Sequence, residues 1–148
     1  MREAKRYEIV RTQLVREKTA LYANRFVKSP DDAANLARAV IGDSDREQFV
    51  VMMLNTKNEL NAIHVVSIGS LNTSIVHPRE TFKAAVVSSA SGVVFAHNHP
   101  SNDISPSSED VETTKRLVEA GNILGIKVLD HVIISQDRYY SFKEAGLL

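Results

Sequence analysis

Three side chains within residues 97–110 have the chemistry and the spacing to share one divalent cation. His97 and His99 are two residues apart, and Asp110 follows eleven residues after His99. If the histidines lie at the end of a strand, the period of two puts both imidazoles on one face. Two imidazole nitrogens and one carboxylate oxygen are the ligands of a catalytic zinc ion, whose fourth position stays open for water. The pattern therefore predicts one zinc ion that activates water for hydrolysis.

A serine in the same segment allows two interpretations. Ser107 precedes Asp110 by three residues. A hydroxyl there could donate to a developing oxyanion or position a water molecule. The same pair fits a capping box, in which the serine side chain accepts from the backbone near the start of a helix. The two roles are compatible, because a capped helix would fix the carboxylate of Asp110 in place.

Hydrolysis also needs a general base, and three glutamates near predicted strand ends could supply it. They are Glu47, Glu59 and Glu80. Glu47 precedes the apolar run Phe49–Leu54, which we expect to be a central strand that can lie beside Gly92–Ala96. Glu47 is therefore the favoured base.

The tip of a strand and the start of a helix must bring these residues together. Gly92–Ala96 is a short apolar run that leads directly into His97, which indicates a buried strand. Ser105 followed by Pro106 is typical of an N-cap with proline at the first helical position. We expect that helix to continue to about residue 124 and to end at Gly125.

The rest of the chain alternates between helix and strand patterns. Ser29-Pro30 starts a helix that Gly42 ends, and Pro78 opens another. Further strands are predicted at residues 49–54, 60–68, 128–134 and 138–140. We therefore expect an α/β (α+β) fold, with a mixed sheet and helices packed on its faces.

Composition limits the possible function classes. The 148 residues fit one compact domain, and 43% of them are hydrophobic. The chain has no cysteine, which excludes disulfides, thiolate ligands and a cysteine nucleophile. Cysteine-ligated zinc deaminases are excluded for the same reason. No signal peptide or membrane segment is visible, so we expect a soluble cytoplasmic protein.

Charge is unevenly placed along the chain. Residues 1–28 hold eight basic and three acidic side chains, a net charge of +5 in a protein whose formal net charge is zero. We interpret residues 1–28 as a basic extension, with a short strand or helix around Tyr7–Leu14, and residues 29–148 as the domain. A solvated extension is the favoured interpretation, and contact with nucleic acid is the alternative.

At the site residues the chain resembles the JAMM metalloproteases, also called MPN+ or JAB domains. Their motif is an upstream Glu followed by H-x-H, seven residues and S-x-x-D, and residues 97–110 match it without a gap. Over roughly residues 30–148 the chain is similar to the RadC branch, in the blocks HPRETFKAA (77–85), AHNHPSND (96–103), LDHVIIS (129–135) and YYSFKEAGLL (139–148).

The resemblance implies a layout like that of cytidine deaminase and a role for each matched residue. His97, His99 and Asp110 would be zinc ligands, Glu47 the general base, and Ser107 the oxyanion or water contact. The bond cleaved by JAMM enzymes is a peptide or isopeptide bond, so the implied partner is a peptide or protein substrate.

Two positions depart from the pattern of the RadC branch. Asn102 stands where that branch usually has glycine, and Ile104 where it often has proline. Asparagine is the next best residue after glycine for a left-handed backbone, so we expect the loop to keep its shape. His131, at the start of a predicted strand, is read as a packed histidine rather than a group that supports a metal ligand.

Two other functions remain open at this point. One is a nucleic-acid-associated module of the DNA repair type, in which the basic extension contacts phosphates. The other is a metal-free scaffold that keeps the fold. The sequence does not indicate an oligomeric state.

Overall fold

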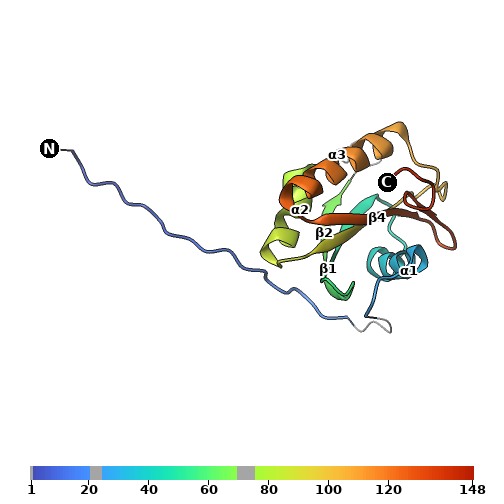
Figure 1. The fold of residues 1–148 in the computed structure, drawn as a ribbon, viewed down its shortest axis with the longest axis horizontal. Coiled ribbons are helices and arrows are strands. Elements are labelled where there is room, and N and C mark those ends of the chain that lie inside the picture. The colour runs from blue at the N-terminus through green and yellow to red at the C-terminus, as the bar shows by residue number, and fades with distance from the viewer. Residues whose placement is uncertain (1, 21–24, 70–75) are drawn as a thin grey trace.

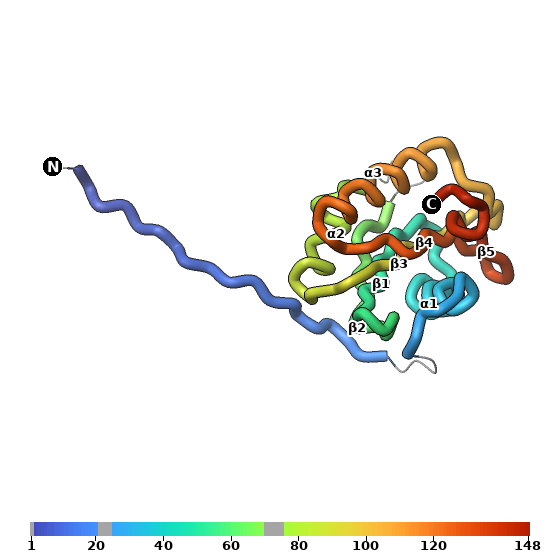
Figure 2. Tube along the Cα trace, in the orientation of Figure 1, coloured from blue at the N-terminus to red at the C-terminus, as the bar shows by residue number. Residues whose placement is uncertain are grey.

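A single sheet lies between two layers of helices. The computed structural model describes residues 2–20, 25–69 and 76–148. Figures 1 and 2 show the elements in order: α1 (Pro30–Ile41), β1 (Gln48–Leu54), β2 (Leu60–Ile68), α2 (Pro78–Val87), β3 (Gly92–Asn98), α3 (Ser108–Leu124), β4 (Lys127–Ile134) and β5 (Tyr139–Ser141). The predicted mixed sheet with flanking helices is confirmed.

The sheet has the strand order β2-β1-β3-β4-β5. β1 is antiparallel to both β2 and β3, β3 and β4 are parallel, and β5 returns antiparallel to β4. All seven residues of β3 are buried, as are six of the seven in β1. The two continuous apolar runs are therefore adjacent strands with both faces covered, as the sequence predicted.

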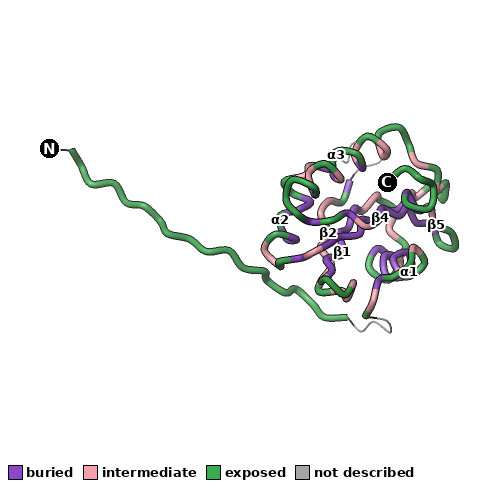
Figure 3. The backbone as a smooth tube through the Cα atoms, in the orientation of Figure 1, coloured by how far each residue is buried: buried purple, intermediate pink, exposed green. Residues whose placement is uncertain are grey.

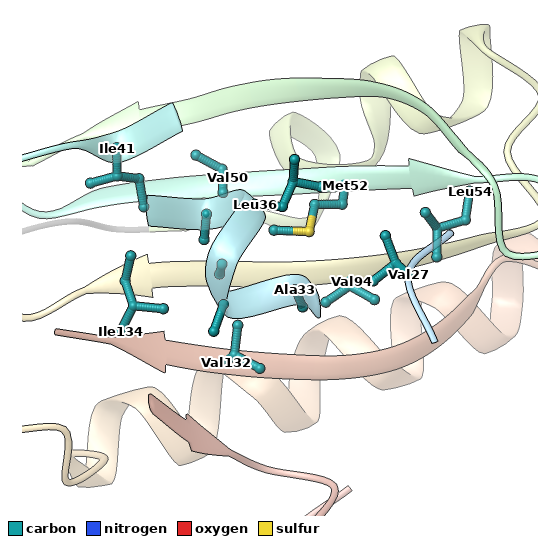
Figure 4. Packing of buried hydrophobic residues seen from close by; sticks show 13 residues of the cluster. Val27, Ala33, Leu36, Ile41, Val50, Met52, Leu54, Val94, Val132 and Ile134 are labelled. Atoms are coloured by element: carbon teal, nitrogen blue, oxygen red, sulfur yellow. The ribbon is translucent and has the colours of Figure 1, made fainter. Parts of the chain in front are cut away.

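Helix α1 covers one face of the sheet. Ser29 caps its start by accepting from the backbone nitrogen of Asp32 at 3.1 Å, and Gly42 ends it at a positive φ of 62°. Leu36 and Ile41 pack on the side chains of β1, β3 and β4 that point to this face (Figure 4). Full burial of one such side chain stabilises the fold by about 1.5–3 kcal/mol.

Helices α2 and α3 cover the opposite face. Phe82 of α2 and Leu117 of α3 pack on a second cluster that includes Phe49 of β1 and Phe95 of β3. Gly121 lies where α3 meets β4, and a Cβ atom there would be 2.5 Å from the carbonyl oxygen of Ile126. Glycine is needed at this contact because nothing larger fits between the helix and the chain that follows it.

The start of α3 differs from the prediction in one respect. The N-cap residue is Ser107 rather than Ser105, and the helix begins at Ser108. Ser107 forms the capping box with Asp110 that the spacing suggested, and this reciprocal pair satisfies the backbone N–H groups of both residues. Among the described residues, no helix is long and apolar enough to cross a membrane.

The predicted element around Tyr7–Leu14 is wrong. Residues 2–20 form neither helix nor strand and are exposed throughout (Figure 3). A short amphipathic segment has too few hydrogen bonds to be stable unless its apolar side packs on something. Val27 is already part of the core, so the chain joins the domain near this residue. The boundary at residue 28 stays a prediction.

Candidate metal centre

The two histidines lie where β3 ends, between its neighbours β1 and β4. His97 is the penultimate residue of β3 and is 5% exposed, while His99 follows the strand and is half-buried. The backbone nitrogen of His99 still donates to the carbonyl of Ile134, the last residue of β4, at 3.3 Å. Because β1 runs antiparallel to β3, the residues just before β1 lie at the same end of the sheet as the residues just after β3.

Four side-chain atoms of the predicted ligands lie close together: Nε2 of each histidine and both carboxylate oxygens of Asp110. Nε2 of His97 lies 3.1 Å from Nε2 of His99, Oδ2 of Asp110 lies 3.2 Å from His99 Nε2, and Oδ1 of Asp110 lies 3.4 Å from His97 Nε2. Ligands about 2.0–2.1 Å from a tetrahedral zinc ion are separated from one another by about 3.3 Å. These three residues could therefore hold such an ion with little rearrangement.

Asp110 owes its place to the start of α3. Its backbone nitrogen donates to Ser107 Oγ at 3.0 Å, and its Oδ2 accepts from the Ser107 backbone nitrogen at 2.9 Å. The capping box thus aims the carboxylate back toward the end of β3. Ser107 Oγ acts as an acceptor in this cap, which leaves its hydroxyl hydrogen for another acceptor.

Of the three candidate bases, only Glu47 lies at this site. Its Oε1 is 3.7 Å from His99 Nε2. One carboxylate oxygen of Glu47 and one ring nitrogen from each of His97 and His99 all lie within 4.8 Å of one another. Glu59 lies at the opposite end of β1 and pairs with Arg25 at 3.1 Å. Glu80 is on α2, where it pairs with Lys83 at 3.0 Å.

The ring of His99 is fixed by the loop that follows it. Its Nδ1 lies 2.6 Å from the carbonyl oxygen of Asp103. A carbonyl can only accept, so the hydrogen is on Nδ1. Asn102 has the expected left-handed backbone, with φ of 66°, and its carbonyl accepts from Arg138 at 3.0 Å. The loop is therefore held at two successive carbonyls, those of Asn102 and Asp103.

In the protein alone, contacts between Asp110 and the two histidines set the charges at this site. Burial raises the pKa of Asp110, but its contacts with the rings of His97 and His99 outweigh burial and hold that pKa well below its usual value. The pKa of His99 is raised, mainly by its hydrogen bond to Asp110, while burial opposes the rise. A bound cation would take the place of the protons that these groups otherwise share.

Sequence reasoning missed three residues that support the site. Asn98, between the histidines, donates from Nδ2 to the Arg46 carbonyl at 3.0 Å and accepts at Oδ1 from the Gln48 backbone at 2.8 Å. Its position inside H-x-H was the only signal, and such a signal does not predict a direction for the side chain.

The other two missed residues are His131 and Thr114. His131 Nε2 lies 2.7 Å from His97 Nδ1, and its Nδ1 lies 2.7 Å from Thr114 Oγ1. The interpretation of His131 as only a packed histidine is therefore wrong, because it touches a predicted ligand. Burial lowers the pKa of His131 well below its usual value. Thr114 is one helical turn after Asp110, which is a spacing that could have suggested it.

A cleft of about 530 Å³ opens beside the site. Its walls include Asn98, His99 and Pro100 from the end of β3, together with Asp43 and Asp45 from the segment between α1 and β1. A substrate chain lying in this cleft would pass next to His99, the one predicted site residue among its walls.

Comparisons with known proteins identify close relatives of this sequence. A family model described as a RadC-like JAB domain matches residues 27–147. A UPF0758 protein of Caldanaerobacter subterraneus is 62% identical over 123 residues, which are 83% of this chain and 53% of the relative. UPF0758 proteins of Alkaliphilus metalliredigens (82% of this chain, 53% of the relative) and Methanosarcina mazei (84% and 54%) are 54% and 48% identical. The chain spans about half the length of these curated relatives.

Proposed function

This chain belongs to the RadC-like JAB domain family, and we propose that it is a zinc-dependent hydrolase that cleaves a peptide or isopeptide bond. His97, His99 and Asp110 hold the ion in this proposal. Glu47 is the general base, and Ser107 contacts the oxyanion. The chain itself would supply every group that the reaction needs apart from the ion and the water.

The observation that carries the proposal is the close approach of the side chains of His97, His99 and Asp110. The two Nε2 atoms are 3.1 Å apart, and the nearest carboxylate oxygens lie 3.2 and 3.4 Å from them, close to the ligand separation of about 3.3 Å expected around a tetrahedral zinc ion. Nδ1 of His99 carries the hydrogen, so the Nε2 atom of that ring is the one suited to a metal. Three protein ligands leave one coordination position for water or substrate, as in catalytic rather than structural sites.

Zinc bound there would supply Lewis acidity, which acidifies water and polarises a carbonyl group. Glu47, whose carboxylate lies 3.7 Å from the ring of His99, would take a proton from the attacking water and pass it to the leaving amine. Ser107 has its hydroxyl hydrogen free of the cap and donates it to the oxygen of the carbonyl under attack.

The substrate lies in the cleft beside His99 in this proposal. Two acidic side chains, Asp43 and Asp45, and one basic side chain, Arg38, line that cleft, so a substrate with basic side chains near the cleaved bond would be favoured there over an acidic one.

The test compares Glu47→Gln with the unchanged chain and with Glu59→Gln as a matched control. Glu59 is at the opposite end of β1, so its loss leaves the site intact. Zinc content is measured by elemental analysis, and hydrolysis with a quenched fluorescent peptide library. We expect one zinc ion per chain in all three proteins, and a loss of hydrolysis of about 10²–10⁴-fold in Glu47→Gln alone.

Each other outcome points to a different conclusion. Hydrolysis retained by Glu47→Gln would remove Glu47 as the base. A chain that binds no zinc when it is supplied would favour the metal-free scaffold and overturn the proposal.

A further inference from the structure

A continuous set of hydrogen bonds runs behind the candidate metal centre. Thr114 Oγ1 lies 2.7 Å from the carbonyl oxygen of Asp110 and 2.7 Å from His131 Nδ1. His131 Nε2 then lies 2.7 Å from His97 Nδ1. Thr114 and His131 are each 1% exposed, so water does not compete for these bonds. Three elements, α3, β4 and β3, are joined in this way.

The hydrogen bond between Thr114 and the Asp110 carbonyl fixes the direction of the one between Thr114 and His131. Two oxygen atoms 2.7 Å apart need a hydrogen between them, and a carbonyl has none to give. Thr114 therefore donates its only hydroxyl hydrogen to the carbonyl of Asp110. Its oxygen is left as an acceptor toward His131, so the hydrogen between Thr114 and His131 belongs to Nδ1 of the histidine.

The surroundings of His131 fix the direction of the third hydrogen bond, between His131 and His97. Its ring stacks on Phe142, with centroids 4.7 Å apart, and meets the ring of Phe49 at 5.4 Å. An imidazole enclosed among aromatic rings stays neutral, because burying a charge there is costly. With its one hydrogen on Nδ1, His131 accepts at Nε2, and His97 is the donor through Nδ1.

We propose that Thr114 and His131 set the tautomer of His97, so that Nε2 of His97 faces the metal site as a free lone pair. Thr114 and His131 are positioning residues in this scheme and touch neither metal nor substrate. The inference rests on the metal site of the proposed function, but the tautomer itself can be observed without metal.

These hydrogen bonds link two predicted ligands, Asp110 and His97, through the first turn of α3. The backbone carbonyl of Asp110 anchors the hydrogen-bond chain that orients His97, while its carboxylate lies 3.4 Å from Nε2 of the same histidine. His99 is oriented separately, by the carbonyl of Asp103. A histidine that binds a metal usually donates a hydrogen bond from its second ring N–H to a carbonyl, a carboxylate or water. Fixing that bond raises metal affinity.

The test uses Thr114→Val, which has the same shape without the hydroxyl, and Thr114→Ser, which keeps the hydroxyl. In metal-free protein at mildly alkaline pH, long-range ¹⁵N NMR spectra show which ring nitrogen of each histidine carries hydrogen. We expect Nδ1–H in both His97 and His131 for the unchanged chain and for Thr114→Ser. In Thr114→Val, His131 has no acceptor at Nδ1, so both rings should move their hydrogen to Nε2.

Zinc affinity is then measured by competition with a chromophoric chelator. We expect Thr114→Val to bind zinc about 10–100-fold more weakly than the unchanged chain, and Thr114→Ser to restore most of the affinity. Thermal unfolding of each variant shows whether the fold is kept.

Two results would overturn the inference. One is Nε2–H on His97 in the unchanged chain, a measurement that needs no variant to fold. The other is a folded Thr114→Val protein with unchanged zinc affinity. Neither depends on hydrolysis, so a chain with the expected tautomers that cleaves nothing would count against the proposed function alone.

Discussion

The side-chain amide of Asn98 holds the backbone on both sides of Glu47. It accepts from the backbone nitrogen of Gln48 at 2.8 Å and donates to the carbonyl of Arg46 at 3.0 Å. Asn98 is 7% exposed, so these bonds are shielded from water. The residue between the two histidines therefore connects the predicted ligands to the predicted base.

We expect Asn98→Ala to impair hydrolysis more than zinc binding. Loss of both bonds frees the segment that carries Glu47, and small misplacements of a reacting group can cost about 10²-fold in rate. Asn98 is not one of the predicted ligands, so zinc affinity should change little. The measurement is the rate of peptide cleavage at saturating zinc, beside the affinity from chelator competition.

Asn55→Ala is the matched control for this prediction. Asn55 also holds the backbone with its side chain, accepting from Lys57 and Glu59 at 2.9 and 3.0 Å, but at the opposite end of β1. Both variants should lose about 1–3 kcal/mol of stability. Equal rates in the two variants would refute the positioning role of Asn98.

Zinc should stabilise the fold, and a chelator should reverse this. A ligand that binds only the folded state at about 100 times its Kd adds about 2.7 kcal/mol. Thermal unfolding with zinc and with EDTA measures the difference for each protein. Asp110→Asn keeps the size of the side chain but loses its charge, so its zinc-dependent shift should be much smaller. An equal shift in this variant would mean that the ion binds elsewhere.

Gly121→Ala should destabilise the fold, although alanine is the better helix former. The added Cβ atom would lie 2.5 Å from the Ile126 carbonyl oxygen and 3.1 Å from Val128 Cγ2. Such overpacking costs about 1–3 kcal/mol. The neighbouring Asn122 is exposed on the same helix, and Asn122→Ala should leave stability within about 0.5 kcal/mol. Urea unfolding of both variants checks the contrast, and similar midpoints would contradict it.

Asp130 ties the end of the chain to the sheet. Its carboxylate accepts from Ser141 Oγ at 2.6 Å, from the His131 backbone at 2.7 Å and from the Lys143 backbone at 3.0 Å. Asp130→Asn would turn an amide hydrogen toward one of these donors, at a cost of about 1.5–3 kcal/mol. Denaturant unfolding measures this loss of stability. Asp43→Asn is the control, because Asp43 is exposed. A stability equal to that of the control would show that the charge is not needed.

Deletion of residues 1–20 should leave stability unchanged, because residues 2–20 are exposed and make no core contact. We expect the melting temperature to be the same with and without them. Binding to duplex DNA at low salt is measured in parallel. Salt-sensitive binding by the full chain that disappears on deletion would support the nucleic-acid alternative.

Local patterns predicted most of the fold. The apolar runs of β1 and β3, the caps at Ser29 and Gly42, and the spacing of His97 and His99 depend on neighbours within a few residues. Such contacts follow from the period of a helix or a strand, so they are present in the sequence itself. Where two similar signals competed, as at Ser105 and Ser107, the sequence alone chose wrongly.

What the sequence by itself determined is the set of residue types and their local geometry: two imidazoles at a strand end and a carboxylate in a capped first turn. Only the tertiary structure decided that Glu47 reaches His99, that Asn98 holds the segment of Glu47, and that Thr114 and His131 lie behind His97. These contacts join residues up to 52 positions apart. They depend on strand order and register, which are set by packing of the whole sheet rather than by any short stretch of chain.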